Sequence, residues 1–190
     1  MTNEDAYLTG KLLIAMPSMS DPRFARSVVY ICNHSEDGAL GLIINKKINS
    51  LTFVKILDQL DIRVNDTESG QPRAIFFGGP VEIERGFILH SLDYHTDHTL
   101  VINEEFGMTA SIEIIKELAK GNGPKQSLIA LGYSGWGTGQ LDGELQNNDW
   151  LSVDADADLM FNENSDDKWD NALNKVGVSA ALLSTESGHA

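Results

Sequence analysis

The chain alternates short, β-branched apolar runs with turn signals, and this pattern limits it to a fold built around a sheet. Helical stripes, in which apolar residues recur every three or four positions, interrupt these runs only a few times. Because the stripes do not alternate with every run, the pattern predicts an α+β fold with a largely antiparallel sheet. The expected strands are 11–16, 27–33, 39–45, 74–77, 86–90, 99–102, a short piece near 108, 127–131 and 150–153. The expected helices are 52–60, 112–120, 140–147 and a last one from 166 or 167 to 176.

Local signals mark some of the boundaries between these elements. Glu36-Asp37-Gly38 is a turn signal between two apolar runs, which predicts an antiparallel hairpin. Thr52 precedes a helical stripe and is expected to cap that helix, and Gly121 is expected to end the next one.

The size of the chain predicts one domain. A length of 190 residues is enough for one hydrophobic core, and no linker, low-complexity tract or internal repeat divides the sequence. We therefore expect a single domain over 1–190. About 1–9 and 184–190 are polar ends and are expected to be loosely ordered.

The charge balance argues against two classes of partner. The chain has 14 Lys and Arg against 28 Asp and Glu, a net charge of -14. Duplex DNA and anionic membrane surfaces both require a basic footprint, so direct nucleic-acid binding and membrane binding are not expected. A local basic patch could still contact nucleic acid. A single cysteine, no signal-peptide pattern and no long apolar run predict a cytoplasmic protein.

Acidic residues concentrate near the C-terminus. Residues 141–170 hold ten acids and one base, Lys168. The ordinary interpretation is a solvated face, and the functional hypothesis is a docking surface for a basic protein partner. Asp154, Asp156 and Asp158 are the candidate partner-binding residues.

Neither metal-like pattern in the sequence is complete, so no metal site and no cofactor are expected. The three acids from Asp154 begin like a calcium loop, but Leu159 stands where Gly is needed and Ser165 where Glu is needed. His95 and His98 lie in a polar segment that is expected to be a solvated loop.

The glycine-rich stretch Leu131–Leu141 is expected to be a loop that carries function or packs on the core. It fails as a nucleophile elbow around Ser134, because bulky Trp136 follows where a second Gly is needed. It also fails as a dinucleotide loop, because Asp142 stands where the last Gly belongs. We therefore assign no catalytic residue.

A ligand pocket floored by this stretch is the alternative hypothesis. In it, aromatic side chains would stack on a ligand, polar groups would bond to it, and arginines at strand borders would contact an anion. The candidate ligand-binding residues are Tyr133, Ser134, Trp136, Gln140, Arg26 and Arg85.

Several motifs together resemble one bacterial family. They are GKLLIAMP from Gly10, DPRFARSVVYIC from Asp21, GALGLIIN from Gly38, GGPV from Gly78, RGFILH from Arg85, LGYSGWGTGQL from Leu131, NDWL from Asn148, and Lys168-Trp169. In this order, the set is similar to the YqgE/AlgH family over nearly the whole chain.

The resemblance implies an α+β domain whose mostly antiparallel sheet curls into a flattened barrel, flanked by helices. It also implies a cytosolic bacterial protein, labelled a transcriptional regulator because of a link to alginate control, without an established active site. Two functions follow from the residues and the resemblance together. The first is a non-enzymatic regulatory or adaptor protein. The alternative is a small-ligand binder or enzyme with a pocket at the Gly132–Gln140 stretch.

Overall fold

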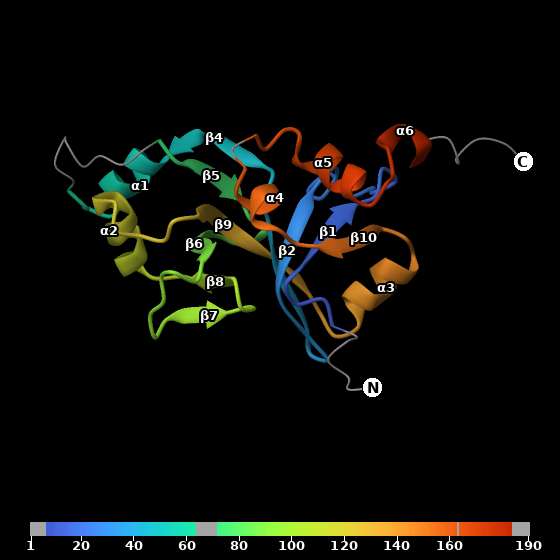
Figure 1. The fold of residues 1–190 in the computed structure, drawn as a ribbon, viewed down its shortest axis with the longest axis horizontal. Coiled ribbons are helices and arrows are strands. Elements are labelled where there is room, and N and C mark those ends of the chain that lie inside the picture. The colour runs from blue at the N-terminus through green and yellow to red at the C-terminus, as the bar shows by residue number, and fades with distance from the viewer. Residues whose placement is uncertain (1–6, 64–71, 163, 184–190) are drawn as a thin grey trace, which may run out of the picture.

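The fold is α+β, with a mostly antiparallel sheet curled into a half-barrel and helices on its flanks (Figure 1). A computed structural model describes residues 7–63, 72–162 and 164–183. The predicted fold class is confirmed. The predicted disorder at the termini falls largely on 1–6 and 184–190, outside the described residues. Tyr7 to Thr9 are held by His34, whose Nδ1 accepts from the Leu8 N–H at 3.1 Å.

The described part of the chain forms the following strands and helices. The strands are β1 (Lys11–Ala15), β2 (Val28–Ser35), β3 (Gly38–Ile43), β4 (Lys47–Thr52), β5 (Ala74–Phe77), β6 (Val81–Ser91), β7 (Thr99–Val101), β8 (Phe106–Thr109), β9 (Ser127–Trp136) and β10 (Trp150–Asp154). The helices are α1 (Phe53–Gln59), α2 (Ile112–Lys120), α3 (Gln140–Gln146), α4 (Ala157–Phe161), α5 (Lys168–Lys175) and α6 (Ala180–Leu183).

Strand β9 joins the two halves of the sheet. The strands run β10-β1-β2-β3-β9-β6-β8-β7, with β5 lying beside β9 and β4 beside β5. The first half of β9 pairs in parallel with β5 and antiparallel with β6, while its second half pairs with β3. Figure 1 shows β9 between a part carrying α1 and α2 and a part carrying β1, β10 and α3.

Several predicted boundaries are confirmed. The turn at 36–37 joins β2 and β3 in an antiparallel hairpin, in which Ser35 pairs with Gly38. The Thr52 side chain accepts the Lys55 N–H at 3.3 Å and so caps α1. Gly121 ends α2 with φ of 80°, in the left-handed region that glycine adopts readily.

The buried apolar residues form three clusters on the two faces of the curled sheet. One includes Tyr30, Leu42, Leu128 and Trp169. A second lies under α1 and α2, and a third is formed where α3 covers β1, β2 and β3. Because side chains alternate along a strand, Leu128 packs in the first cluster and its neighbour Ile129 in the second.

Most of the glycine-rich stretch is strand, not loop. β9 continues through Gly132 to Trp136, and the loop is limited to Gly137–Gly139 before α3. The expectation of a loop from Leu131 was therefore wrong. Glycine is rare in ordinary strands, and here it permits a close approach of another backbone segment.

That segment is the β5–β6 turn, and its contacts with β9 explain the glycines. The Gly78 N–H donates to the Leu131 carbonyl oxygen at 2.8 Å, and the Gly78 carbonyl accepts the Ile43 N–H at 2.9 Å. A Cβ on Gly79 would overlap the Tyr133 carbonyl group, and a Cβ on Gly132 would overlap the Gly79 carbonyl oxygen. We call Gly78, Gly79 and Gly132 the glycine junction.

The elements differ from prediction in other places as well. β6 begins at Val81, not near Gly86, and β4 and α6 were not predicted. The pairing between β6 and β9 is interrupted between Val81 and Gly86.

No described helix is long and apolar enough to span a bilayer.

We expect Gly79→Ala to destabilise the protein by about 3 kcal/mol or more, because φ is 154° and the added methyl would meet fixed backbone. The matched control is Gly143→Ala in α3, where a Cβ meets nothing within 4 Å and should stabilise by about 0.5–1 kcal/mol. Chemical denaturation of both variants measures the difference. Equal stability would contradict a steric role for the junction.

Candidate binding groove

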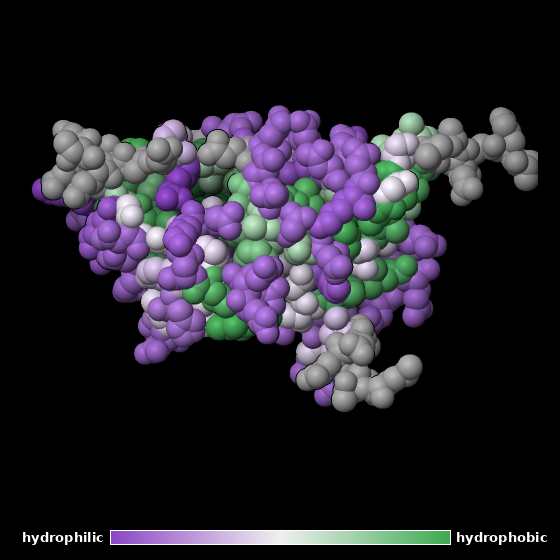
Figure 2. All heavy atoms as spheres, viewed as in Figure 1, coloured by the Kyte–Doolittle hydropathy of each residue, from purple (hydrophilic) through white to green (hydrophobic). Residues whose placement is uncertain are grey.

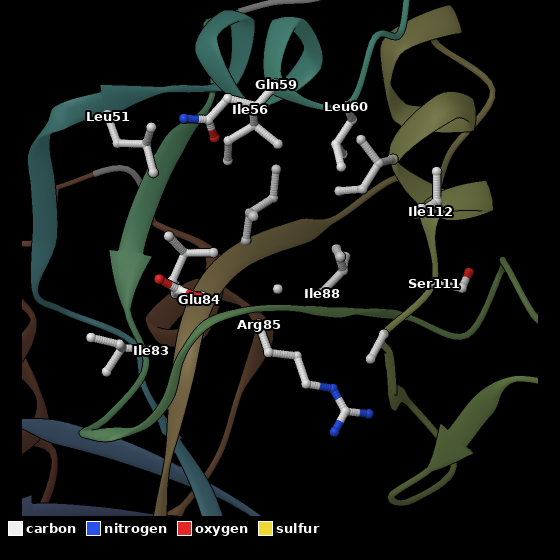
Figure 3. A pocket seen from close by; sticks show the side chains of 15 residues that line it. Leu51, Ile56, Gln59, Leu60, Ile83, Glu84, Arg85, Ile88, Ser111 and Ile112 are labelled. Carbon is white, nitrogen blue, oxygen red and sulfur yellow. The ribbon is translucent and has the colours of Figure 1, made fainter.

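An apolar groove of about 550 Å³ lies between α1, α2 and the sheet (Figure 3). Its floor is formed by Ile88 of β6 and Ile129 of β9, both buried in the second cluster. Ile56 on α1 and Ile115 on α2 form its walls. We call this hollow the α1–α2 groove.

Large apolar side chains remain exposed at the rim of this groove. Ile83 is 58% exposed, Ile112 is 49% exposed and Leu60 is 39% exposed, and all three line the hollow. Scattered exposed apolar residues are normal, but three around one apolar hollow form a patch of the kind that marks a binding surface.

The first part of β6 forms one side of the groove and has unusual backbone geometry. Glu82 has φ of 47°, in the left-handed region, and lies within the interrupted pairing with β9. β8 pairs with β6 only from Ile88 onward. This irregular segment therefore carries Ile83, Glu84 and Arg85. In Figure 3 the Arg85 side chain extends away from α1.

The predicted ligand residues on β9 differ in their surroundings. Ser134 is fully buried, and its hydroxyl donates to the Gly78 carbonyl at 3.1 Å. Tyr133 packs against the first cluster, while Trp136 belongs to the third on the opposite face. A shallow hollow of about 460 Å³ touches both aromatic residues. The two rings do not form a pair that could enclose one ligand.

Trp136 packs in the core, one of the two expectations for this stretch, and its indole also anchors α3. Its indole N–H donates to Glu144 Oε2 at 2.9 Å, and the indole N–H of Trp150 donates to the same oxygen at 2.8 Å. Gln140, a predicted ligand residue, donates through its side chain to Glu144 Oε1 at 2.9 Å. Glu144 on α3 thus fixes that helix to two buried tryptophans.

The two predicted anion-binding arginines lie apart from these residues and from each other. Arg26 lies over the Trp169 ring, with its Cζ 4.2 Å from the centroid, and pairs with Asp170 at 3.2 Å. Arg85 pairs with Glu82 at 3.3 Å and lines the α1–α2 groove. Both arginines therefore form ion pairs with carboxylates of the same chain.

The three predicted partner-binding acids lie close together, and two of them have internal partners. Asp154 pairs with Lys11, and Asp156 pairs with Lys175. Asp156 also caps α4 by accepting the Leu159 N–H at 2.7 Å. Asp158 is exposed in the first turn of α4.

The remaining reactive side chains have structural surroundings. Cys32 is buried, and burial raises the pKa of its thiol well above the usual range. His90 lies between the Ser91 carbonyl and the Thr109 hydroxyl, and burial lowers the pKa of its ring. Within the described residues, no three His, Cys, Asp or Glu side chains are placed to hold a metal ion.

Comparison with known proteins identifies the family. A family model described as AlgH-like matches residues 12–181. The chain belongs to the AlgH-like family. A UPF0301 protein of Jannaschia sp. is 49% identical over 185 residues, covering 96% of this chain and 95% of the relative. One of Bradyrhizobium sp. is 47% identical over 195 residues, covering 100% and 90%.

Solved structures confirm that this family shares the fold. The solution structure of the AlgH protein from Pseudomonas aeruginosa matches with a TM-score of 0.78 and 39% identity, over 97% of this chain and 96% of that one. A crystal structure of a Corynebacterium diphtheriae protein has a TM-score of 0.74 at 22% identity, covering 94% and 92%, and shows the same fold.

Sequence reasoning missed the groove because its residues come from separate elements. One local signal was present. Val81 to Arg85 alternates apolar and charged residues, the pattern of a strand with one apolar face. Ile83 on that face is the most exposed of the apolar rim residues.

We expect Glu144→Ala to lower the free energy of unfolding by about 2–4 kcal/mol, because it leaves two indole N–H groups without their acceptor. Glu144→Gln should cost less, since its amide oxygen can still face both indoles. Urea unfolding followed by tryptophan fluorescence measures both. Equal losses in the two variants would contradict the hydrogen-bonding role.

Proposed function

We propose that this AlgH-like protein is a non-enzymatic regulatory adaptor that binds a protein partner through the α1–α2 groove. The observation that carries the proposal is the apolar hollow of about 550 Å³ with Leu60, Ile83 and Ile112 exposed at its rim. Such a surface loses water when an apolar partner segment binds, which supplies the driving force for association.

The occupant we propose is an amphipathic helix of the partner, with an apolar face and basic flanking residues. The groove offers apolar side chains from two helices and the sheet, a setting in which a helix can place residues spaced three and four apart. The protein carries a net charge of -14, which would attract basic residues and speed their encounter.

Two features support an adaptor over an enzyme. Ser134 and Cys32 carry a hydroxyl and a thiol, groups that can act as nucleophiles in enzymes. Both side chains are buried, and the Ser134 hydroxyl donates to a main-chain carbonyl. The groove itself is lined mostly by aliphatic side chains. An effect on transcription, as the family label suggests, would then pass through a bound protein in the cytoplasm.

The sharpest test replaces the most exposed apolar residue at the rim. We expect Ile83→Lys to retain fewer proteins than wild type when both are used as bait in bacterial lysate, with bound proteins quantified by mass spectrometry. The reason is that a charge in the apolar groove would have to lose its hydration on binding. The readout is the set of proteins bound by wild type and lost by the variant.

The matched control is Val101→Lys, because Val101 is 51% exposed on β7 and does not line the groove. Circular dichroism melting should show that both variants are folded. If the two variants retain the same proteins as wild type, the groove is not the partner site.

The acidic surface yields a separate prediction. We expect Asp154→Lys combined with Asp158→Lys to weaken retention of a basic partner, most strongly at low salt, because surface charges act over about 10 Å at 0.1 M salt. This pair leaves Asp156 in place as the cap of α4. Glu104→Lys with Glu105→Lys changes the net charge equally elsewhere, and equal losses in the two double variants would reject the local acidic surface.

A further inference from the structure

We infer that the protein has a second site, a cationic cavity between β4, β5, β9 and α5 that binds the oxyanion of a small organic phosphate or carboxylate. The cavity has a volume of about 390 Å³. Its polar lining comes from Lys47, Arg73, Ser127, Asn162 and Lys168, and no Asp or Glu is among the described lining residues. This is unusual for a chain with a net charge of -14.

Lys168 is the deepest cation of the cavity. It is 1% exposed, and its ammonium group donates to the carbonyl oxygens of Ile44 at 2.9 Å and Met160 at 2.8 Å. An ammonium group has three donors, so one remains for a further acceptor. Burial and the neighbouring positive charge of Lys47 lower the pKa of Lys168 to about 7.

A buried charge without an ionic partner is costly, and Lys168 makes no ion pair within the described residues. Two carbonyl acceptors compensate part of this cost. A bound anion would compensate the rest, which is why the position of Lys168 points to a ligand as well as to a structural role.

Arg73 provides independent evidence from the opposite wall. One of its terminal nitrogens donates to the Ser127 hydroxyl at 2.9 Å, which fixes the guanidinium against β9. Its Nε is buried and has no hydrogen-bond partner. Buried guanidinium donors in native proteins usually have an acceptor, and an oxyanion bound beside Arg73 would supply one.

The apolar lining indicates what the anion is attached to. Phe76, Leu128 and Phe161 line the same cavity, and the Lys168 ammonium lies 5.2 Å from the centre of the Phe76 ring. Cations and aromatic side chains in one cavity fit a ligand with a phosphate or carboxylate on an apolar or aromatic body. Inorganic phosphate has no apolar part, so it would make no apolar contact with these side chains.

This site is independent of the proposed adaptor function. Leu128 and Phe76 of the cavity belong to the first cluster, whereas the floor of the α1–α2 groove belongs to the second. Ile129 lines both hollows, but Arg73 and Lys168 line only the cavity. Loss of one site can therefore be measured while the other is kept.

The experiment titrates phenyl phosphate, phenylacetate and inorganic phosphate into the full chain, by calorimetry and by amide chemical shifts. We expect the two organic anions to bind and to shift amides at 73–76 and 127–129, with inorganic phosphate much weaker. Arg73→Gln and Lys168→Met should each weaken binding about tenfold, the size expected for one lost charged hydrogen bond. Lys116→Gln, an exposed lysine on α2, should change affinity less than about twofold.

The pH dependence separates a ligand contact from a structural role. A bound anion favours charged Lys168, so phenylacetate affinity should fall as pH rises through about 7, while the carboxylate itself stays ionised. Lys47 and Arg73 are the other charged groups among the described lining residues. In Lys168→Met the affinity should be flat with pH.

Three outcomes would overturn the site. They are no binding of either organic anion, shifts confined to residues away from the cavity, or folded Arg73→Gln and Lys168→Met variants that bind as wild type does. Since Arg73→Gln leaves the contacts of Lys168 in place, it tests the site even if Lys168→Met fails to fold.

Discussion

Pairing along both edges of β9 is the constraint on which the rest of the structure depends. β5 and β6 flank its first half, and β3 takes the place of β5 along its second half. Apolar clusters also cover both faces of its first half, which agrees with the continuous buried run Leu128-Ile129-Ala130. One strand thus lines both the α1–α2 groove and the cationic cavity.

Local chemistry in the sequence predicted most elements and the fold class, because apolar periodicity and turn residues act over short distances. The course of β9 could not be predicted in the same way. Gly132 is a residue type typical of loops, and only the approach of Gly79, more than fifty positions away, makes glycine suitable for a strand there. The candidate sites could not be predicted for the same reason. Ile83 and Arg73 form a site only together with residues from elements that are distant in the sequence.

In the acidic segment, the described carboxylates lie on the outer surface, whereas the lysine lies in the interior. Figure 2 shows hydrophilic residues over much of one face, including the region of α4 and α5, with hydrophobic residues gathered between α3, β10 and α6. The acids of this region are partly neutralised by Lys11 and Lys175. Lys168, the one base in the acidic segment, points inward instead and bonds to main-chain oxygens. An acidic protein can thus present positive charge, but only inside a cavity.

The late position of β9 in the chain also has a consequence for biosynthesis. Strands β3, β5 and β6 are translated well before residues 127–136, yet each needs β9 as a neighbour. While the ribosome is still making α2, these strands have unpaired edges, and such edges promote association between nascent chains. Strand β1, which is made first, pairs with β10, so this pair can close only after β9 and α3 have also been made.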